Sequence, residues 1–156
     1  MQLCAKLVEG RDPVGALLVA GLRFLVDIGV DAGVEGEVRV LRLPEVERHV
    51  DASAAQCRVP PLVLQPLVEN AVTHGIAALI EGGVIRLDVA RRQDRLSITI
   101  ENPRDTDTPA RTRRGVGLDN VRQRLTTMFG ADARIETRAD EGRYRVELAI
   151  PCFTDD

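Results

Sequence analysis

The sequence predicts an α+β fold, a two-layer sandwich in which helices cover one face of a mixed, mostly antiparallel sheet. The first observation is the order of the periodic segments: helix, strand pair, helix, strand pair, loop, helix, strand pair. The second is that successive strands are joined by short turns, which favours antiparallel pairing. The third is that three helices are enough to cover one face of a single sheet, whereas a doubly wound fold has helices on both faces.

Length and composition predict one domain and exclude several classes of protein. The chain has 156 residues, of which 44% are hydrophobic, so the core needs no metal or disulfide. The net charge of −3 argues against a surface that binds nucleic acid. No apolar run approaches the roughly 20 residues of a membrane span. We therefore expect a cytoplasmic protein, in which Cys4, Cys57 and Cys152 are reduced thiols without a role.

The N-terminal third predicts one helix and two strands. Asp12 followed by Pro13 is typical of a helix start, and apolar residues keep helical spacing as far as Gly29. Residues 37–43 alternate as a strand, and residues 46–50 are a candidate partner for that strand.

A second helix is predicted over residues 60–75. Prolines open this segment, Gly75 closes it, and its middle is apolar on nearly all sides, which is typical of a buried helix. Pro66 is expected to distort the first turn. Residues 84–90 and 96–100 then alternate cleanly and predict a hairpin that turns at Gln93-Asp94.

The C-terminal third predicts a loop, a helix and two strands. Residues 103–114 are polar and include two prolines, so we expect a mobile lid. Helical spacing returns over residues 118–129 and ends at Gly130. Residues 133–138 and 144–150 predict the last two strands.

Three polar residues, Glu69, Asn70 and His74, interrupt the apolar surface of the central helix. Asn70 and His74 are four residues apart and share one face of that helix. A satisfied network of buried polar groups explains them. A site for phosphate and a divalent metal also explains them, because an amide oxygen suits Mg²⁺.

The segment Gly115-Val116-Gly117-Leu118 opens the last long helix. Glycines allow close approach of the backbone, and the free amides at a helix N-terminus attract phosphate. An ordinary hinge has the same sequence pattern. The chain has one lysine, Lys6, and no GxxxxGK[ST] motif, so it is not a P-loop NTPase. Nearby arginines could contact phosphate or form a solvated surface: Arg113, Arg114, Arg122 and Arg124.

Asn102 ends the strand before the polar loop. Its amide can both donate and accept a hydrogen bond, which suits the edge of a heterocycle. It also suits a local turn at Pro103. His49 is expected to be a surface or packing residue.

Taken together, three segments resemble one family. The segment PPLVLQPLVENAVTHG resembles the N-box of LytS/AlgZ-type sensor histidine kinases, GVGLDNVRQRL resembles their second glycine box, and EGRYRVELAIP resembles their closing strand. The resemblance runs from about residue 59 to residue 151. It implies the Bergerat fold of the GHKL ATPases and the catalytic, ATP-binding domain of such a kinase.

The resemblance implies a site for ATP and Mg²⁺. Asn70 would coordinate Mg²⁺, His74 would lie near the phosphates, and Glu69 would polarise the site. Asn102 occupies the position that contacts adenine. The implied catalytic residues are Glu69 and Asn70. The implied binding residues are Asn70, His74, Asn102, Gly115, Val116, Gly117, Leu118 and Arg122.

The implied organisation is a helix over residues 1–30, a candidate remnant of a dimerisation helix, followed by a catalytic domain over residues 31–156. The implied partners are a histidine-bearing dimerisation domain outside this chain, a response regulator with a LytTR-like domain, and a second copy in a homodimer. No direct contact with nucleic acid is expected. A membrane would be reached only through a parent segment that precedes this sequence.

Two alternatives remain beside the histidine kinase. The stretch Asn102–Thr106 lacks the glycines of the family's first glycine box, which suggests a degenerate binding module without turnover. A serine kinase of the anti-sigma type is the other alternative.

Overall fold

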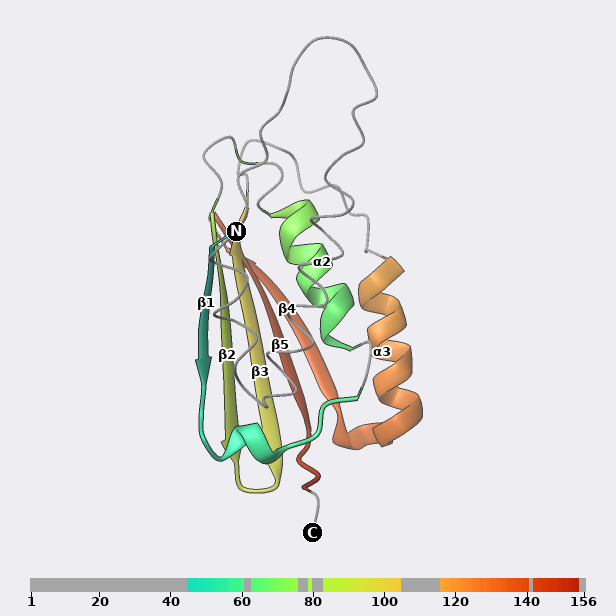
Figure 1. The fold of residues 1–156 in the computed structure, drawn as a ribbon. Coiled ribbons are helices and arrows are strands. Elements are labelled where there is room, and N and C mark those ends of the chain that lie inside the picture. Colours follow the sequence, from blue (N-terminus) through green and yellow to red (C-terminus); the bar gives the residue numbers. More distant parts are fainter. Residues whose placement is uncertain are drawn as a thin grey trace.

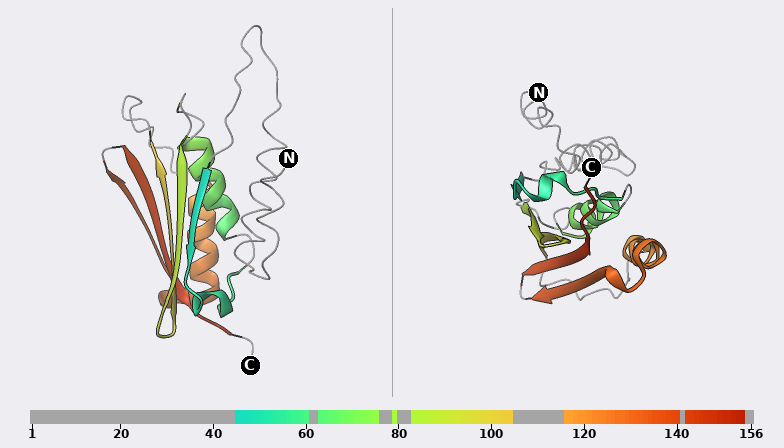
Figure 2. Two further views of the ribbon diagram at one scale, coloured as in Figure 1. Left: turned by 60° about the vertical axis from the view of Figure 1, so that its left-hand side comes forward. Right: turned by 90° about the horizontal axis from the view of Figure 1, so that it is seen from below.

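The computed structural model describes residues 45–60, 63–75, 79, 83–104, 116–140 and 142–154, and it confirms the α+β sandwich. Two α-helices lie on one face of a five-stranded sheet (Figures 1 and 2). The strands are β1 (Glu45–Val50), β2 (Val84–Arg92), β3 (Arg95–Pro103), β4 (Arg134–Asp140) and β5 (Arg143–Pro151). The helices are α2 (Leu64–His74) and α3 (Val116–Phe129), with short 3-10 turns η1 (Ala54–Gln56) and η3 (Gly130–Asp132).

The strand order is β1-β2-β3-β5-β4. β2 with β3, β3 with β5 and β4 with β5 pair antiparallel, while β1 pairs parallel with β2. The hairpin at Gln93-Asp94 is confirmed, and Gln93 has the positive φ of 57° that this turn requires. Residues 46–50 do form a strand, but it pairs with β2. Their predicted partner at 37–43 lies outside the described residues, as do the helix expected at 12–29 and residues 105–114 of the expected lid.

α2 begins later than the sequence predicts, at Leu64 instead of residue 60. Pro66 is therefore the third residue of the helix, and the first four N–H groups of a helix have no partner within it. The proline is thus tolerated within the first turn. Neither α2 nor α3 nor any other helix within the described ranges has the length and hydropathy of a membrane-spanning segment.

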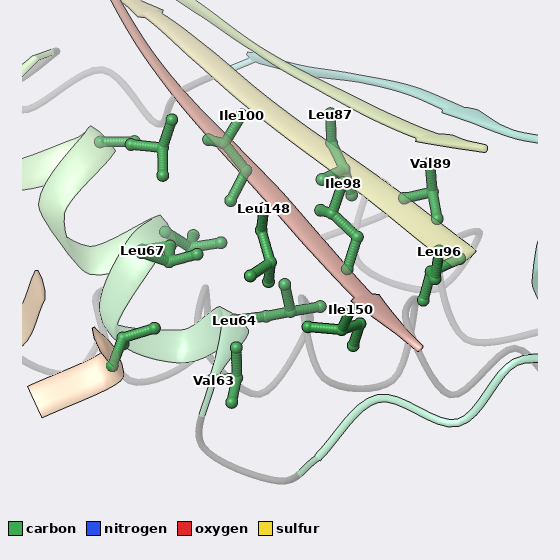
Figure 3. Packing of buried hydrophobic residues seen from close by; sticks show 14 of the residues in the cluster. Val63, Leu64, Leu67, Leu87, Val89, Leu96, Ile98, Ile100, Leu148 and Ile150 are labelled. Atoms are coloured by element: carbon green, nitrogen blue, oxygen red, sulfur yellow. The ribbon is translucent and has the colours of Figure 1, made fainter. Parts of the chain in front are cut away.

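The hydrophobic core lies between the sheet and the two helices. Side chains alternate along each strand, so every second residue of β2, β3 and β5 faces the helices (Figure 3). The opposite face of the sheet is polar. The largest buried side chains are Leu64, Leu67, Ile85, Leu87, Leu96, Ile98, Ile100, Leu125, Leu148, Ile150 and Val63.

A disulfide joins Cys57 to Cys152, so the expectation of reduced thiols is wrong for these two cysteines. Their Cα atoms are 5.0 Å apart although the residues are 95 positions apart in sequence. Cys57 lies just after η1 and Cys152 just after β5, two segments whose proximity depends on the folded sheet. An odd number of widely spaced cysteines contains no signal for this pairing.

Gly142, between β4 and β5, has a φ of +78°, and a Cβ added there would meet no atom within 4 Å. Gly142→Ala is therefore expected to lower the free energy of unfolding by about 1–2 kcal/mol through backbone strain alone. Urea denaturation at neutral pH measures this loss. Gly142→Asn is the control and should lose less stability, because asparagine tolerates the left-handed region. Equal losses for the two variants would contradict backbone strain as the cause.

Candidate functional site

The first turn of α3 lies against α2. A Cβ built on Gly117 would lie 3.5 Å from the Cβ of Pro66, and the two helices are neighbours in the fold (Figure 1). Asn70 is four residues after Pro66, so it lies one turn further along the same side of α2. The half-buried Asn70 and the N-terminal turn of α3 are thereby brought to one region of the molecule.

The end of β3 lies against the end of α2. Asn102 is 3% exposed, and its Nδ2 donates a hydrogen bond of 2.8 Å to the carbonyl oxygen of Pro103. The same Nδ2 atom would be only 2.1 Å from a Cβ built on Gly75, the residue that follows α2. The absence of a side chain at Gly75 therefore makes room for Asn102. His74 precedes Gly75 as the last residue of α2.

The other predicted residues lie on the same two helices. Glu69 is half-buried, and its Oε1 accepts a hydrogen bond of 2.8 Å from Nε2 of Gln65, one turn earlier. Leu118 is 8% exposed and belongs to the core cluster, so only its backbone is available to a ligand. Val116 is the first residue of α3.

Of two predicted phosphate-binding residues, Gly115 and Arg122, the structure describes only Arg122. Gly115 lies outside the described residues. Arg122 lies on α3, and its Nη1 is 3.3 Å from Oδ1 of Asp119 in an exposed pair three residues apart. Such a pair contributes little to stability, so the guanidinium can exchange Asp119 for a more strongly charged partner at small cost.

A charged cluster that the sequence analysis missed surrounds Glu101, on the polar face of the sheet. Glu101 is 8% exposed. Its Oε2 accepts hydrogen bonds of 2.9 and 2.6 Å from Nε and Nη2 of Arg145, and its Oε1 accepts one of 2.9 Å from Nη1 of Arg143. Nη1 of Arg86 lies 3.8 Å from the same Oε1. Arg86 and Arg145 are the register partners of Glu101 on β2 and β5, so strand alternation combined with the correct pairing could have revealed the cluster.

The cluster ties three strands together beside Asn102. Glu101 directly precedes Asn102 on β3, with its side chain on the opposite face of the sheet. The hydrogen bond from Arg145 is the main cause that lowers the pKa of Glu101, and partial burial acts in the opposite direction. Glu101 is therefore charged at neutral pH and fixes the strand end that carries Asn102.

A cavity of about 260 Å³ lies near this cluster. It is lined by Gly83, Val84, Arg86, Glu101, Asn102, Pro103, Gly142 and Arg143. Asn102 is the one predicted site residue among them. The cavity is smaller than the roughly 300–1,000 Å³ of ordinary ligand pockets, and the carboxylate of Glu101 already pairs with its arginines. The described part of the cavity therefore offers little room for a triphosphate.

The described residues fit a magnesium ion only when phosphate supplies further oxygens. Within the described ranges no group of three or more His, Cys, Asp or Glu side chains is placed to hold a metal. The side-chain oxygen of Asn70 is the available donor on the relevant side of α2. One amide oxygen with water and phosphate oxygens is a donor set that suits Mg²⁺, which usually keeps several waters.

The pKa of Glu101 gives a prediction for stability against pH. A carboxyl group whose pKa is lowered by folding contributes stability that is fully present above its unfolded value of 4.5 and is lost as pH falls through its folded value. The midpoint of urea denaturation should therefore fall as pH drops below about 4.5. Glu101→Gln should reduce this fall, because the group no longer titrates. Glu136→Gln, which changes an exposed ion pair with Arg134, should leave it unchanged. A fall as steep in Glu101→Gln as in the original protein would contradict the assignment.

Comparisons with known proteins agree with this architecture. No family model matches the sequence. The sensor histidine kinase BtsS of Escherichia coli (strain K12) is 30% identical over 108 residues, which cover 69% of this chain and 19% of that protein. The sensor histidine kinase YesM of Bacillus subtilis (strain 168) is 31% identical over 109 residues, which cover 66% of this chain and 19% of that protein. The sensor protein LytS of Oceanobacillus iheyensis is 24% identical over 117 residues, which cover 66% of this chain and 20% of that protein. The chain thus spans about a fifth of the length of these relatives.

Solved structures share the fold at low sequence identity. The blue-light activated histidine kinase of Erythrobacter litoralis EL346 has a TM-score of 0.55 at 18% identity, covering 90% of this chain and 42% of that chain. The histidine kinase AdeS of Acinetobacter baumannii has a TM-score of 0.55 at 13% identity, and the match covers 88% of this chain and 64% of that chain. The fold is therefore that of a histidine kinase domain, and about two thirds of the chain is similar in sequence to one segment of the sensor histidine kinases BtsS and YesM and of the sensor protein LytS.

Proposed function

We propose that the chain binds ATP with Mg²⁺ between α2 and the start of α3, and that it transfers the γ-phosphoryl group to a histidine outside this chain. One observation supports this most directly. Gly117 lies against Pro66, so the first turn of α3 adjoins the side of α2 that carries Asn70. A phosphate-binding helix terminus and a metal-binding amide are thus available to the same ligand.

Each of these residues would have a defined part in binding. The backbone amides in the first turn of α3 would donate hydrogen bonds to phosphate oxygens, and the positive end of the helix dipole would favour them further. The bare backbone at Gly117 allows a close approach. Asn102, at the end of β3, would hydrogen-bond the edge of the base through its amide, provided that its Nδ2 gives up the hydrogen bond to the carbonyl oxygen of Pro103. Because the whole chain has one lysine, we expect arginine side chains to make the contacts with phosphate. Arg122 is the candidate on α3.

Asn70 would hold Mg²⁺ through its side-chain oxygen, and the ion would neutralise phosphate charge when bound. Glu69 would accept a hydrogen bond from the attacking imidazole or an ordered water, provided that it gives up its hydrogen bond from Gln65. Phosphoryl transfer depends mainly on position and charge neutralisation, so a site of amides, glycine backbone and one carboxylate is sufficient.

The proposed partners are those that the similarity to sensor histidine kinases suggests. The acceptor would be the histidine of a dimerisation domain, and the next step would pass the phosphoryl group to a response regulator. The proposed place of action is the cytoplasm, because ATP is the donor. The relatives are about five times as long as the matched segment, so the signal they sense would act through parts of the protein beyond this domain.

Titration of the purified chain with ATP, with and without Mg²⁺, is the first test. Binding that strengthens with Mg²⁺ is expected, and its absence at millimolar nucleotide would contradict the proposal. The second test supplies a histidine-bearing dimerisation domain and γ-labelled ATP. An acid-labile phosphohistidine supports the kinase. Binding without transfer would instead favour a binding module, and an acid-stable phosphoserine would favour a serine kinase.

A further inference from the structure

The disulfide lies where two parts of the chain, the segment after η1 and the β2–β3 turn, meet the C-terminal segment. Cys57, 1% exposed, is bonded to the half-buried Cys152 just beyond β5. Beside the bond, the backbone N–H of Arg58 donates to the carbonyl oxygen of Phe153 at 2.8 Å. The N–H of Cys152 donates to the carbonyl oxygen of Asp94, at the β2–β3 turn, at 2.7 Å. We call Cys57, Arg58, Cys152 and Phe153 the C-terminal clasp.

The clasp connects the two helices that form the candidate site. Cys57 is six residues before Val63, the fully buried residue from which α2 starts. The ring of Phe153 stacks on Phe129, the last residue of α3, with centroids 5.9 Å apart. The clasp therefore connects the entry to α2 with the end of α3. Asn70 lies further along α2, and Gly117 lies in the first turn of α3, at the opposite end from Phe129.

We propose that the Cys57–Cys152 bond is a redox-sensitive clasp whose reduction frees the C-terminal segment and loosens the arrangement of α2 and α3. The effect on nucleotide binding and the cytoplasmic location rest on the function proposed above, whereas the structural effect of reduction on the clasp does not. In a cytoplasmic protein a disulfide is more often transient or redox-sensing than permanent. The pairing of two segments 95 positions apart gives such a bond a large influence on stability.

The chemistry needs a dithiol reductant. One thiolate attacks Sγ of Cys152, the more accessible partner, and the sulfur–sulfur bond breaks with Cys57 leaving as a thiolate that takes up a proton. The second thiol of the reductant then closes its own disulfide and releases Cys152. Two electrons and two protons pass from the reductant to the cysteine pair, and an oxidant of the disulfide class reverses the reaction.

The test uses the full chain carrying Cys4→Ser, which removes the third thiol. Alkylation should modify no cysteine before treatment with dithiothreitol and two cysteines after it. Reduction should lower the melting temperature by about 10 °C. It should also raise amide hydrogen exchange at Arg58 at least tenfold, because the acceptor on Phe153 is released. Cys152→Ser should behave like the reduced protein and no longer respond to dithiothreitol.

A third readout is the affinity for ATP with Mg²⁺, which we expect to fall about threefold or more on reduction. An unchanged melting temperature and unchanged exchange after verified reduction would overturn the clasp. Unchanged ATP affinity with changed exchange would overturn its link to the site. If neither redox state binds ATP while reduction still alters exchange and melting, the clasp is supported and the proposed function fails.

Discussion

Gly75→Ala is expected to lower the free energy of unfolding by about 2–3 kcal/mol and to displace Asn102. The new Cβ would lie 2.1 Å from Nδ2 of Asn102 and 2.4 Å from the carbonyl oxygen of Ala71. The carbonyl belongs to the backbone of α2 and also accepts the N–H of Gly75, so it cannot move without disturbing the helix end. Asn102 is almost fully buried and has little space to retreat into. Urea denaturation measures the loss.

Gly117→Ala is the matched control for this substitution. Its Cβ would meet Pro66 at 3.5 Å, an ordinary contact, and alanine favours a helix over glycine. It should therefore leave stability unchanged or raise it slightly. The double variant Gly75→Ala with Asn102→Ala should recover only part of the loss, because the clash with Ala71 remains. A Gly75→Ala protein as stable as Gly117→Ala would show that the two segments are not packed as described.

Much of the fold could be predicted because its signals are local. Alternation over residues 84–90 and 96–100 fixed which side chains enter the core, and the observed hairpin confirms it. Gly130 was expected to end α3, and its φ of +57° is the left-handed conformation that glycine favours. These features depend on neighbours within a few residues, which a single sequence contains.

What could not be predicted depends on contacts distant in sequence. β1 pairs parallel with β2, although the whole of α2 lies between these two strands in the sequence. Nothing within residues 46–50 specifies that partner. The bond between Cys57 and Cys152 needs the sheet to bring the two segments together. Glu101 was overlooked for the same reason, since its arginines come from β2 and β5.

The candidate site combines local sequence patterns with contacts between residues that are distant in sequence. Asn70 and Gly117 stood out individually, one as a polar residue on an apolar helix and the other as a glycine at a helix start. Their common location rests on the contact between Gly117 and Pro66, which only the fold reveals. The close fit of Asn102 over Gly75 likewise needed coordinates, because a glycine at a helix end is ordinary in sequence.

Asn70→Ala is expected to remove the dependence of ATP binding on Mg²⁺ and to weaken binding of ATP with Mg²⁺ at least tenfold, about 1.4 kcal/mol. Asn70 would provide its side-chain oxygen as a metal ligand on the side of α2 that faces the first turn of α3. Alanine has no oxygen in its side chain to replace it. Stability should change by less than about 1 kcal/mol, since Asn70 is only half-buried and alanine favours a helix. Calorimetric titration with and without Mg²⁺ gives the binding, and urea denaturation gives the stability.

Thr73→Ala separates a metal-binding role from a general effect on α2. Thr73 is exposed on the same helix, three residues after Asn70, and its replacement removes a polar group of similar size. It should leave both the affinity for ATP and its dependence on Mg²⁺ unchanged. If Asn70→Ala keeps the full dependence on Mg²⁺, the amide does not bind the metal. The alternative left for Asn70 is then a polar residue that only stabilises the buried helix, and the case for a nucleotide site between α2 and α3 loses its main support.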